Sequence, residues 1–370
     1  MKFILAVSFL LIISSCNSKK EYLLVGTYTS GKSKGVYVYE FNGDDKTAKL
    51  VDSAQTSNPS YLAVSPDQRF VYAANEDDAK TGGGRVTAFS FDKSNGALKQ
   101  INQQPTLGDH PCYVTVDKTG KWVIAGNYSS GSISVIPVNP DGSLANRVTV
   151  VQHQGHGTDT SRQQSPHVHS TVLSADNKFL FVPDLGIDRV MIYAFNESSG
   201  MLTPTKDTAA WVQDGSGPRH FIFSPSNKYA YLVQELSGTI TVFKYTSGKL
   251  EAEQITSMLP KDYKGPFTSA DIHLSPDGKF LYASNRETSN TIAIFKVDES
   301  NGKISLVGHQ STLGIAPRNF NFDPSGDYLL VANQKSDQIV VFKVNHETGL
   351  LSDTGQRINV GNPVCVKWID

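Results

Sequence analysis

The stretch NPSYLAVSPDQRFVYAAN, residues 58–75, contains the pattern that decides the fold. Residues 61–64 form a short β run, Ser65-Pro66-Asp67-Gln68 has the composition of a tight turn, and residues 70–74 form a second apolar run. Asp suits such a turn because its side chain can bond nearby backbone, and Pro suits it because its φ is fixed. The stretch therefore predicts two adjacent strands joined by a turn.

Copies of this stretch recur along the chain. They read HPCYVTVDKTGKWVIAGN at 110–127, HVHSTVLSADNKFLFVPD at 167–184, GPRHFIFSPSNKYAYLVQ at 217–234, TSADIHLSPDGKFLYASN at 268–285 and APRNFNFDPSGDYLLVAN at 316–333. The position of Pro59 recurs at 111, 168, 218, 269, 317 and 363, with spacings of 46 to 57 residues. Third strands are expected at 86–91, 132–138, 189–195, 239–245, 291–297 and 338–344, and a fourth strand follows, as at 98–102. Four strands in each repeat of this length are typical of a β-propeller blade.

The two ends of the chain supply the strands of one blade. The seventh copy begins at Pro363 and leaves room for only one strand before the chain stops. Residues 22–28 fit the second strand of a blade, 34–41 the third and 49–55 the fourth. Pairing the termini removes an open sheet edge, which a closed ring requires. The sequence predicts an all-β, seven-bladed β-propeller with four antiparallel strands per blade, in which residues 22–370 form a single domain.

The first residues have the composition of an export signal. Lys2 carries a positive charge, residues 3–13 are almost entirely apolar, and Ser14-Ser15 precede Cys16. This order predicts a lipoprotein-type signal peptide over 1–15, lipid attachment at Cys16 and a tether over 16–21; a plain secretory signal is the alternative. The apolar run is too short for a permanent membrane span. We expect an exported protein that is anchored by lipid to the bacterial envelope and faces the periplasm or the cell surface.

Composition excludes other classes of protein. The chain has 34 Lys and Arg against 35 Asp and Glu, so nothing favours nucleic acid as a partner. Hydrophobic residues make up 39%, which is enough for a large core.

Cys112 and Cys365 are expected to be two buried thiols, although an exported compartment permits a disulfide. We expect a monomer.

Alignment of the repeats brings polar residues to equivalent positions. A first register set follows the anchor proline and contains Ser60, Cys112, His169, Arg219, Ala270, Arg318 and Val364. A second register set follows the end of the second strand and contains Tyr28, Glu76, Tyr128, Leu185, Glu235, Arg286 and Gln334. Asp184, His220 and Asn319 flank these sets. Equivalent blade positions have equal radius and height around the axis, so the sequence predicts one site at one end of the central channel.

The segments SPHVHS at 165–170, VPDLGIDR at 182–189, GPRH at 217–220 and ASNR at 283–286, in this order, resemble the seven-bladed propeller lactonases. That family includes the propeller-type 6-phosphogluconolactonases, and fungal carboxy-muconate cyclases are similar to it. The resemblance covers the whole chain after the signal. It implies lactone chemistry without a metal or other cofactor, on a small-molecule lactone. Export puts 6-phosphogluconolactone itself in question, because it is a cytoplasmic metabolite.

The resemblance implies catalytic roles for His167 or His169, Arg219, Glu235 and Arg286. Arginines suit the oxyanion of an opening lactone, and a carboxylate or imidazole suits proton transfer from water. As substrate-binding residues we expect Arg162, Asp184, His220, Arg318 and Asn319. The arginines and Glu235 could instead be structural ion pairs, and Asp184 could be a turn former.

Residues 152–165 interrupt the repeat. They contain His153, His156 and Arg162, but no carboxylate or Cys at ligand spacing, so a metal site is disfavoured. A loop that covers the channel mouth and brings Arg162 to the substrate fits better.

Three functions remain open. The leading one is a metal-independent lactonase that acts on a sugar-derived (6-phosphogluconolactone-like) or related acidic lactone. The alternatives are a lactone-forming cycloisomerase and a non-catalytic, surface-anchored binding propeller. A serine hydrolase is disfavoured, because the chain lacks a Gly-x-Ser-x-Gly motif at a strand-to-helix turn.

Overall fold

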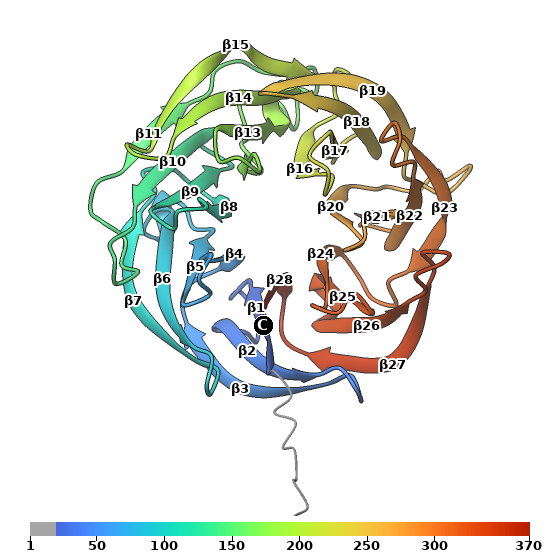
Figure 1. Ribbon diagram of the computed structural model, residues 1–370, viewed down its shortest axis with the longest axis horizontal. Coiled ribbons are helices and arrows are strands. Elements are labelled where there is room, and N and C mark those ends of the chain that lie inside the picture. Colours follow the sequence, from blue (N-terminus) through green and yellow to red (C-terminus); the bar gives the residue numbers. More distant parts are fainter. Residues whose placement is uncertain (1–19) are drawn as a thin grey trace, which may run out of the picture.

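The computed structural model describes residues 20–370, which form a ring of seven four-stranded sheets (Figure 1). In each sheet the first strand lies nearest the ring axis and the last strand lies at the rim. The predicted all-β, seven-bladed propeller is confirmed. Among the described residues the only helical pieces are three 3-10 turns, η1 (Ala79–Thr81), η2 (Leu185–Ile187) and η3 (Gln334–Ser336).

The strands follow the predicted repeat, blade by blade. Blade 1 contains β4 (Pro59–Val64), β5 (Phe70–Asn75), β6 (Arg85–Asp92) and β7 (Ala97–Pro105), and blade 2 contains β8 (Pro111–Val116), β9 (Trp122–Asn127), β10 (Ser132–Pro137) and β11 (Thr149–Gln152). Blade 3 contains β12 (Val172–Leu173), β13 (Phe179–Asp184), β14 (Arg189–Asn196) and β15 (Met201–Trp211), and blade 4 contains β16 (Pro218–Phe223), β17 (Tyr229–Gln234), β18 (Thr239–Thr246) and β19 (Lys249–Ser257). Blade 5 contains β20 (Ser269–Leu274), β21 (Phe280–Asn285), β22 (Thr291–Val297) and β23 (Ile304–Ser311), and blade 6 contains β24 (Pro317–Phe322), β25 (Tyr328–Asn333), β26 (Gln338–Val344) and β27 (Leu351–Asn359).

Blade 7 joins the two ends of the chain. It contains β28 (Pro363–Ile369) at the axis, followed by β1 (Glu21–Thr27), β2 (Gly35–Asn42) and β3 (Thr47–Gln55). The pairing is antiparallel, and Tyr22 lies opposite Ile369. Each strand of the pair satisfies backbone groups that would otherwise form an open edge, so the predicted closure is confirmed.

In blades 1 to 6 the turn between the first two strands is built from its own side chains. In blade 1 the Ser65 hydroxyl accepts from the Phe70 amide at 2.9 Å and donates to Asp67 at 2.6 Å. Gln68 then adopts a left-handed φ of 57°. The equivalent residue in blade 5 is Gly278, at φ 74°. Glycine adopts this region without strain, which explains the Asp-Gly turn of that copy.

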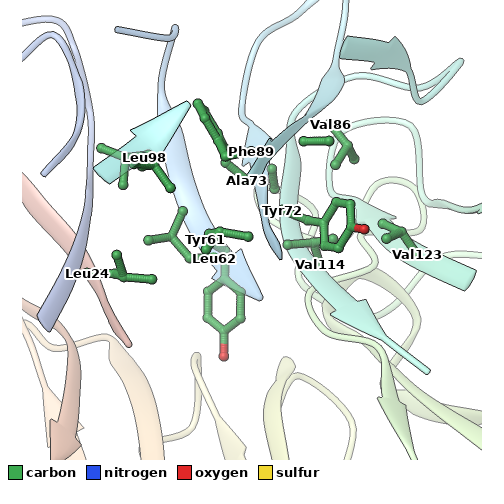
Figure 2. Close-up of a cluster of buried hydrophobic side chains, with 14 of the residues drawn as sticks. Leu24, Tyr61, Leu62, Tyr72, Ala73, Val86, Phe89, Leu98, Val114 and Val123 are labelled. Atoms are coloured by element: carbon green, nitrogen blue, oxygen red, sulfur yellow. The ribbon is translucent and has the colours of Figure 1, made fainter. Parts of the chain in front are cut away.

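The core lies between neighbouring blades. In β5 the consecutive residues Val71, Tyr72, Ala73 and Ala74 are all fully buried, so both faces of the strand are covered. Figure 2 shows part of the cluster that Leu24, Leu62 and Val114 form from three successive blades. Because every blade packs on two neighbours, the ring holds the ends of the inner strands in fixed relative positions.

Several predictions concern single residues or the termini. Cys112 and Cys365 are both buried and free, as expected. The signal peptide over 1–15, the lipid site Cys16 and most of the tether lie outside the described residues. Between residues 20 and 370, no helix has the length and apolar character needed to cross a membrane.

Candidate active site

The two register sets meet at one end of the ring axis, where they line a cavity of about 310 Å³. Its lining residues are Tyr28, Glu76, Cys112, Tyr128, Arg162, His169, Glu235, Thr268, Arg286, Glu287 and Arg318. Eight of these eleven belong to the register sets read from the sequence. Blade alignment therefore located the polar cavity, and most of its wall comes from strand ends that the core holds in place.

A β-bulge in the inner strands aims the first register set at the axis. In β24 the pairing skips one residue between Pro317 and Asn319, which leaves Arg318 unpaired, and β8 skips Cys112 in the same way. In β16 the irregularity falls between Pro218 and Phe221 and includes Arg219. An extra residue in one strand re-aims side chains that strict alternation would send to the two faces of the sheet.

Glu235 is the centre of the site. Its Oε2 atom lies 2.9 Å from Arg219 Nε and 3.1 Å from an Arg286 Nη atom, and its Oε1 atom accepts from Arg162 at 2.7 Å. Arg219 and Glu235 are almost fully buried, and Arg286 is 10% exposed. A buried carboxylate is tolerated only when it is paired and hydrogen-bonded, as it is here. One carboxylate therefore orients three guanidiniums around the cavity.

The arginines set the charge state of Glu235. Burial raises the pKa of the Glu235 carboxyl, but the charges of Arg286, Arg219 and Arg162 outweigh burial and lower the pKa to about 2. Burial lowers the pKa of Arg286 to about 10, so this guanidinium is still protonated near neutral pH. A carboxylate with so low a pKa is a poor proton acceptor. The geometry thus favours an orienting role for Glu235.

His169 lies beside this cluster. Its Nε2 atom is 3.9 Å from Glu235 Oε2, too far for a hydrogen bond, and its Nδ1 atom is 3.6 Å from Cys112 Sγ. Burial lowers the pKa of His169 well below its usual range, and the nearby Arg219 lowers it further. His169 is therefore a neutral imidazole at the cavity wall, a form that can accept a proton.

The Arg318 side of the cavity contains a second, looser pair. Arg318 lies 3.7 Å from Glu76 Oε2 and above the Tyr28 ring, 5.3 Å from its centre. Tyr28 donates its hydroxyl to Glu76 Oε2 at 2.8 Å. Arg318 and Glu76 are 18% and 15% exposed, so both face the cavity.

The segment 152–165 places Arg162 in the site, as expected. Its backbone is anchored by Gln163, whose amide donates to the Leu185 carbonyl at 2.8 Å and to Asp188 at 2.7 Å. Arg162 also donates to the Tyr128 hydroxyl at 3.2 Å. Its side chain is 36% exposed, whereas the other arginines are largely covered. Arg162 therefore lines the cavity on its more solvent-exposed side.

His167 and Asp184 lie behind the cavity wall. The His167 ring stacks on Tyr128 with centres 4.5 Å apart, and its Nδ1–H donates to the Tyr128 carbonyl at 2.9 Å. Asp184 bonds His153 Nδ1 at 2.6 Å and accepts from the His167 and Gly186 amides. These contacts give both residues supporting positions. Of the two candidate histidines, only His169 lines the cavity.

His220 and Asn319 lie in a buried tier next to the site. His220 Nδ1 is 2.6 Å from Asp271 Oδ1, and Asn319 donates to Asp271 Oδ2. Burial raises the pKa of Asp271, but His273 and His220 outweigh it and lower the pKa well below its usual range. Neither His220 nor Asn319 lines the cavity. They are better placed to hold the inner strands together than to contact a substrate.

Two further points concern metal binding and the cavity residues for which the sequence predicted no role. Across residues 20–370, no three His, Cys, Asp or Glu side chains come together in a way that could hold a metal ion. Tyr28, Glu76, Cys112 and Tyr128 line the cavity but had no predicted role. Their place in the register sets was the signal that could have identified them.

A closed propeller with arginines, glutamates and a histidine around a polar cavity at one end of its axis has the site of an enzyme. The family model "Lactonase, 7-bladed beta-propeller" matches residues 22–368. The chain therefore belongs to the seven-bladed β-propeller lactonase family, and the predicted enzyme class, a lactone hydrolase, is confirmed at the level of the family.

Named relatives agree with this membership. The chain is 37% identical to a 6-phosphogluconolactonase of Formosa agariphila over 342 residues, covering 91% of this chain and 96% of the relative. It is 35% identical to a 6-phosphogluconolactonase of Bacillus subtilis, covering 93% and 97%. Among solved structures it resembles the periplasmic gluconolactonase of Pseudomonas aeruginosa, with a TM-score of 0.91 and 40% identity, covering 95% of this chain and 99% of the neighbour.

Proposed function

We propose that this protein hydrolyses a sugar-derived lactone in the cavity around Glu235, without a metal. The observation that carries the proposal is the Glu235 carboxylate, which holds Arg162, Arg219 and Arg286 in one cluster beside a neutral His169. Fixed guanidiniums next to a neutral base are what acyl transfer to water requires. The names of the relatives support the same chemistry.

In the proposed reaction the lactone carbonyl oxygen accepts hydrogen bonds from Arg286 and Arg162. A water molecule attacks the carbonyl carbon through its oxygen atom, and His169 Nε2 takes a proton from this water. The two arginines stabilise the oxyanion of the tetrahedral intermediate. When the ring C–O bond breaks, the leaving oxygen takes the proton from the imidazolium, and the product is an open hydroxy acid. Glu235 and Arg219 hold the donors in place throughout.

We also propose that the protein acts outside the cytoplasm. The expected signal over 1–15 and lipid site at Cys16 support export, and the periplasmic gluconolactonase neighbour supports a periplasmic site of action. Labelling with radioactive palmitate tests the anchor: wild type should incorporate lipid and Cys16→Ala should not. Equal incorporation would disprove attachment at Cys16.

The enzyme assay uses purified protein and a panel of aldonolactones, with acid release followed by a pH indicator. Wild type should hydrolyse at least one lactone well above the spontaneous rate. Arg286→Gln should reduce kcat/KM by on the order of 10²-fold or more, because one oxyanion donor is lost. The lack of turnover on every lactone would refute the proposed function, and conversion of a muconate to a lactone would favour the cycloisomerase instead.

A further inference from the structure

We propose that Arg318, Glu76 and Tyr28 form a subsite that selects a neutral, hydroxyl-bearing lactone over a phosphorylated one. The inference rests on the proposed function and extends it to the part of the substrate that does not react. It concerns the side of the cavity where Arg318 lies, whereas the reacting carbonyl is assigned to Arg286 and Arg162.

Arg318 differs from the other arginines of the site in its partners. Arg162, Arg219 and Arg286 all lie within 3.1 Å of Glu235. Within residues 20–370, the Arg318 side chain makes no hydrogen bond, and its nearest carboxylate oxygen is Glu76 Oε2 at 3.7 Å. Its N–H groups face the cavity and remain available as donors to a ligand.

Glu76 supplies the complementary acceptor. Tyr28 donates to Oε2, and in the described part of the chain no donor reaches Oε1. Arg318 and Glu76 thus present free donors and a free acceptor on neighbouring groups, and Tyr28 holds the other oxygen of Glu76. A sugar hydroxyl matches this surface because it can accept from Arg318 and donate to Glu76 at the same time.

A phosphate group matches the same surface poorly. Near neutral pH it carries between one and two negative charges, and in its dianionic form it has acceptors only. It could accept from Arg318, but it would lie against the negative charge of Glu76 and leave that acceptor unpaired. The cavity as a whole offers little compensation, because three arginines and three glutamates line it and their formal charges cancel.

The test compares kcat/KM for glucono-δ-lactone and for its 6-phosphate ester. Wild type should favour the unphosphorylated lactone by on the order of tenfold or more. Glu76→Gln keeps the size of the side chain but removes the charge, and should reduce this preference by about tenfold. The matched control is Glu287→Gln, which removes the charge of another carboxylate in the cavity lining, one that accepts from Thr268, and should change the ratio by less than about threefold.

Three results would overturn the inference: a wild-type preference for the 6-phosphate, an unchanged ratio in Glu76→Gln, or an equal change in Glu287→Gln. Calorimetric titration with inorganic phosphate gives a readout that needs no turnover. Glu76→Gln should bind phosphate more tightly than wild type, and equal affinity would count against the subsite. Thermal unfolding shows that the variants compared are folded.

The outcomes separate this inference from the proposed function. If no lactone of the panel is hydrolysed, the proposed function fails, and the phosphate titration still decides the subsite. If both are hydrolysed and the 6-phosphate is preferred, the proposed function stands and the subsite inference is wrong.

Discussion

Arg162 reaches from the segment 152–165 to Glu235, and its Nη2 atom lies 2.7 Å from Glu235 Oε1. The same guanidinium bonds the Tyr128 hydroxyl, so a residue outside the blade repeat completes the cluster that the repeat positions build. Arg162 is also the most exposed of the three arginines on Glu235. A substrate can therefore displace Arg162 from Glu235 at a lower cost than Arg219 or Arg286.

Replacing Arg162 should separate this contribution from the rest of the site. We expect Arg162→Gln to lower kcat/KM by on the order of 10²-fold, because an oxyanion donor is lost, while the melting temperature changes little. The control is Arg147→Gln, an exposed arginine on another connection. Initial rates on the best lactone measure the effect. If Arg162→Gln kept the rate of the control, the segment would have no part in catalysis.

Glu235 should make the folded state sensitive to acid. The pKa of Glu235 is about 2 in the folded protein, whereas an unperturbed glutamate has a pKa of 4.5. The ionised carboxylate therefore stabilises the folded state, and this stabilisation is fully present above about pH 4.5. That stabilisation, roughly 3 kcal/mol, is lost as the pH falls from 4.5 towards 2. Urea unfolding of wild type and Glu235→Gln measures it. The variant should be less stable at pH 7, and the difference between the two proteins should shrink below pH 4.5. A constant difference across this window would contradict the ionised cluster.

The blade count and the location of the site could be predicted because both follow from the repeat. Equivalent positions such as Glu76 and Glu235 follow the second strand of their blades, and closure of the ring brings them to one end of the axis. Every paired strand lies next to its partner in the chain, except β28 and β1. The repeat alone therefore predicts that these polar residues lie together, without knowledge of their contacts.

The contacts within the site depend on geometry that the repeat does not encode. His167 and His169 are two residues apart, and the sequence alone does not distinguish them, but only His169 lines the cavity. His220 follows Arg219 directly, yet Asp271 holds it in the adjacent tier. Bulges such as the one at Arg318 change the direction of a side chain without a mark in the sequence. The side-chain partners of these residues, and not their positions in the repeat alone, decide which of them line the cavity.

His169 should keep the enzyme active at mildly acidic pH. Burial and neighbouring arginine charge lower the pKa of His169 well below 6.5, so its neutral, proton-accepting form persists as the pH falls from 7. We expect kcat/KM, corrected for spontaneous hydrolysis, to stay level from pH 7 down to about 5.5. An acid limb centred near 6.5 would contradict the assignment.

Two histidine variants test the same assignment without a pH series. His169→Gln should reduce kcat by on the order of 10²-fold to 10⁴-fold, because the proton acceptor is removed. His167→Gln is the matched control, since His167 stacks on Tyr128 behind the wall, and it should cost less than about tenfold. A larger loss in His167→Gln than in His169→Gln would reverse the roles of the two residues.

Cys112 should orient the His169 ring. Its Sγ atom lies 3.6 Å from His169 Nδ1 and 3.7 Å from the carbonyl oxygens of Val168 and His169. Burial raises the pKa of the Cys112 thiol, so it remains protonated and can donate to a carbonyl while its sulfur accepts from Nδ1–H. That arrangement leaves the lone pair of Nε2 facing the cavity, as the proposed reaction requires.

Substituting Cys112 tests this arrangement. Cys112→Ser retains a donor and an acceptor of similar size and should keep most of the activity, whereas Cys112→Ala should lower kcat by about tenfold with little change in KM. Nitrogen-15 chemical shifts of His169 report its tautomer directly: Nδ1 should carry the proton in wild type and in Cys112→Ser. Both tautomers should be populated in Cys112→Ala, because no side-chain partner then favours one of them. If the alanine variant kept the wild-type tautomer and rate, the orientation of His169 would depend on its backbone contacts and not on the thiol.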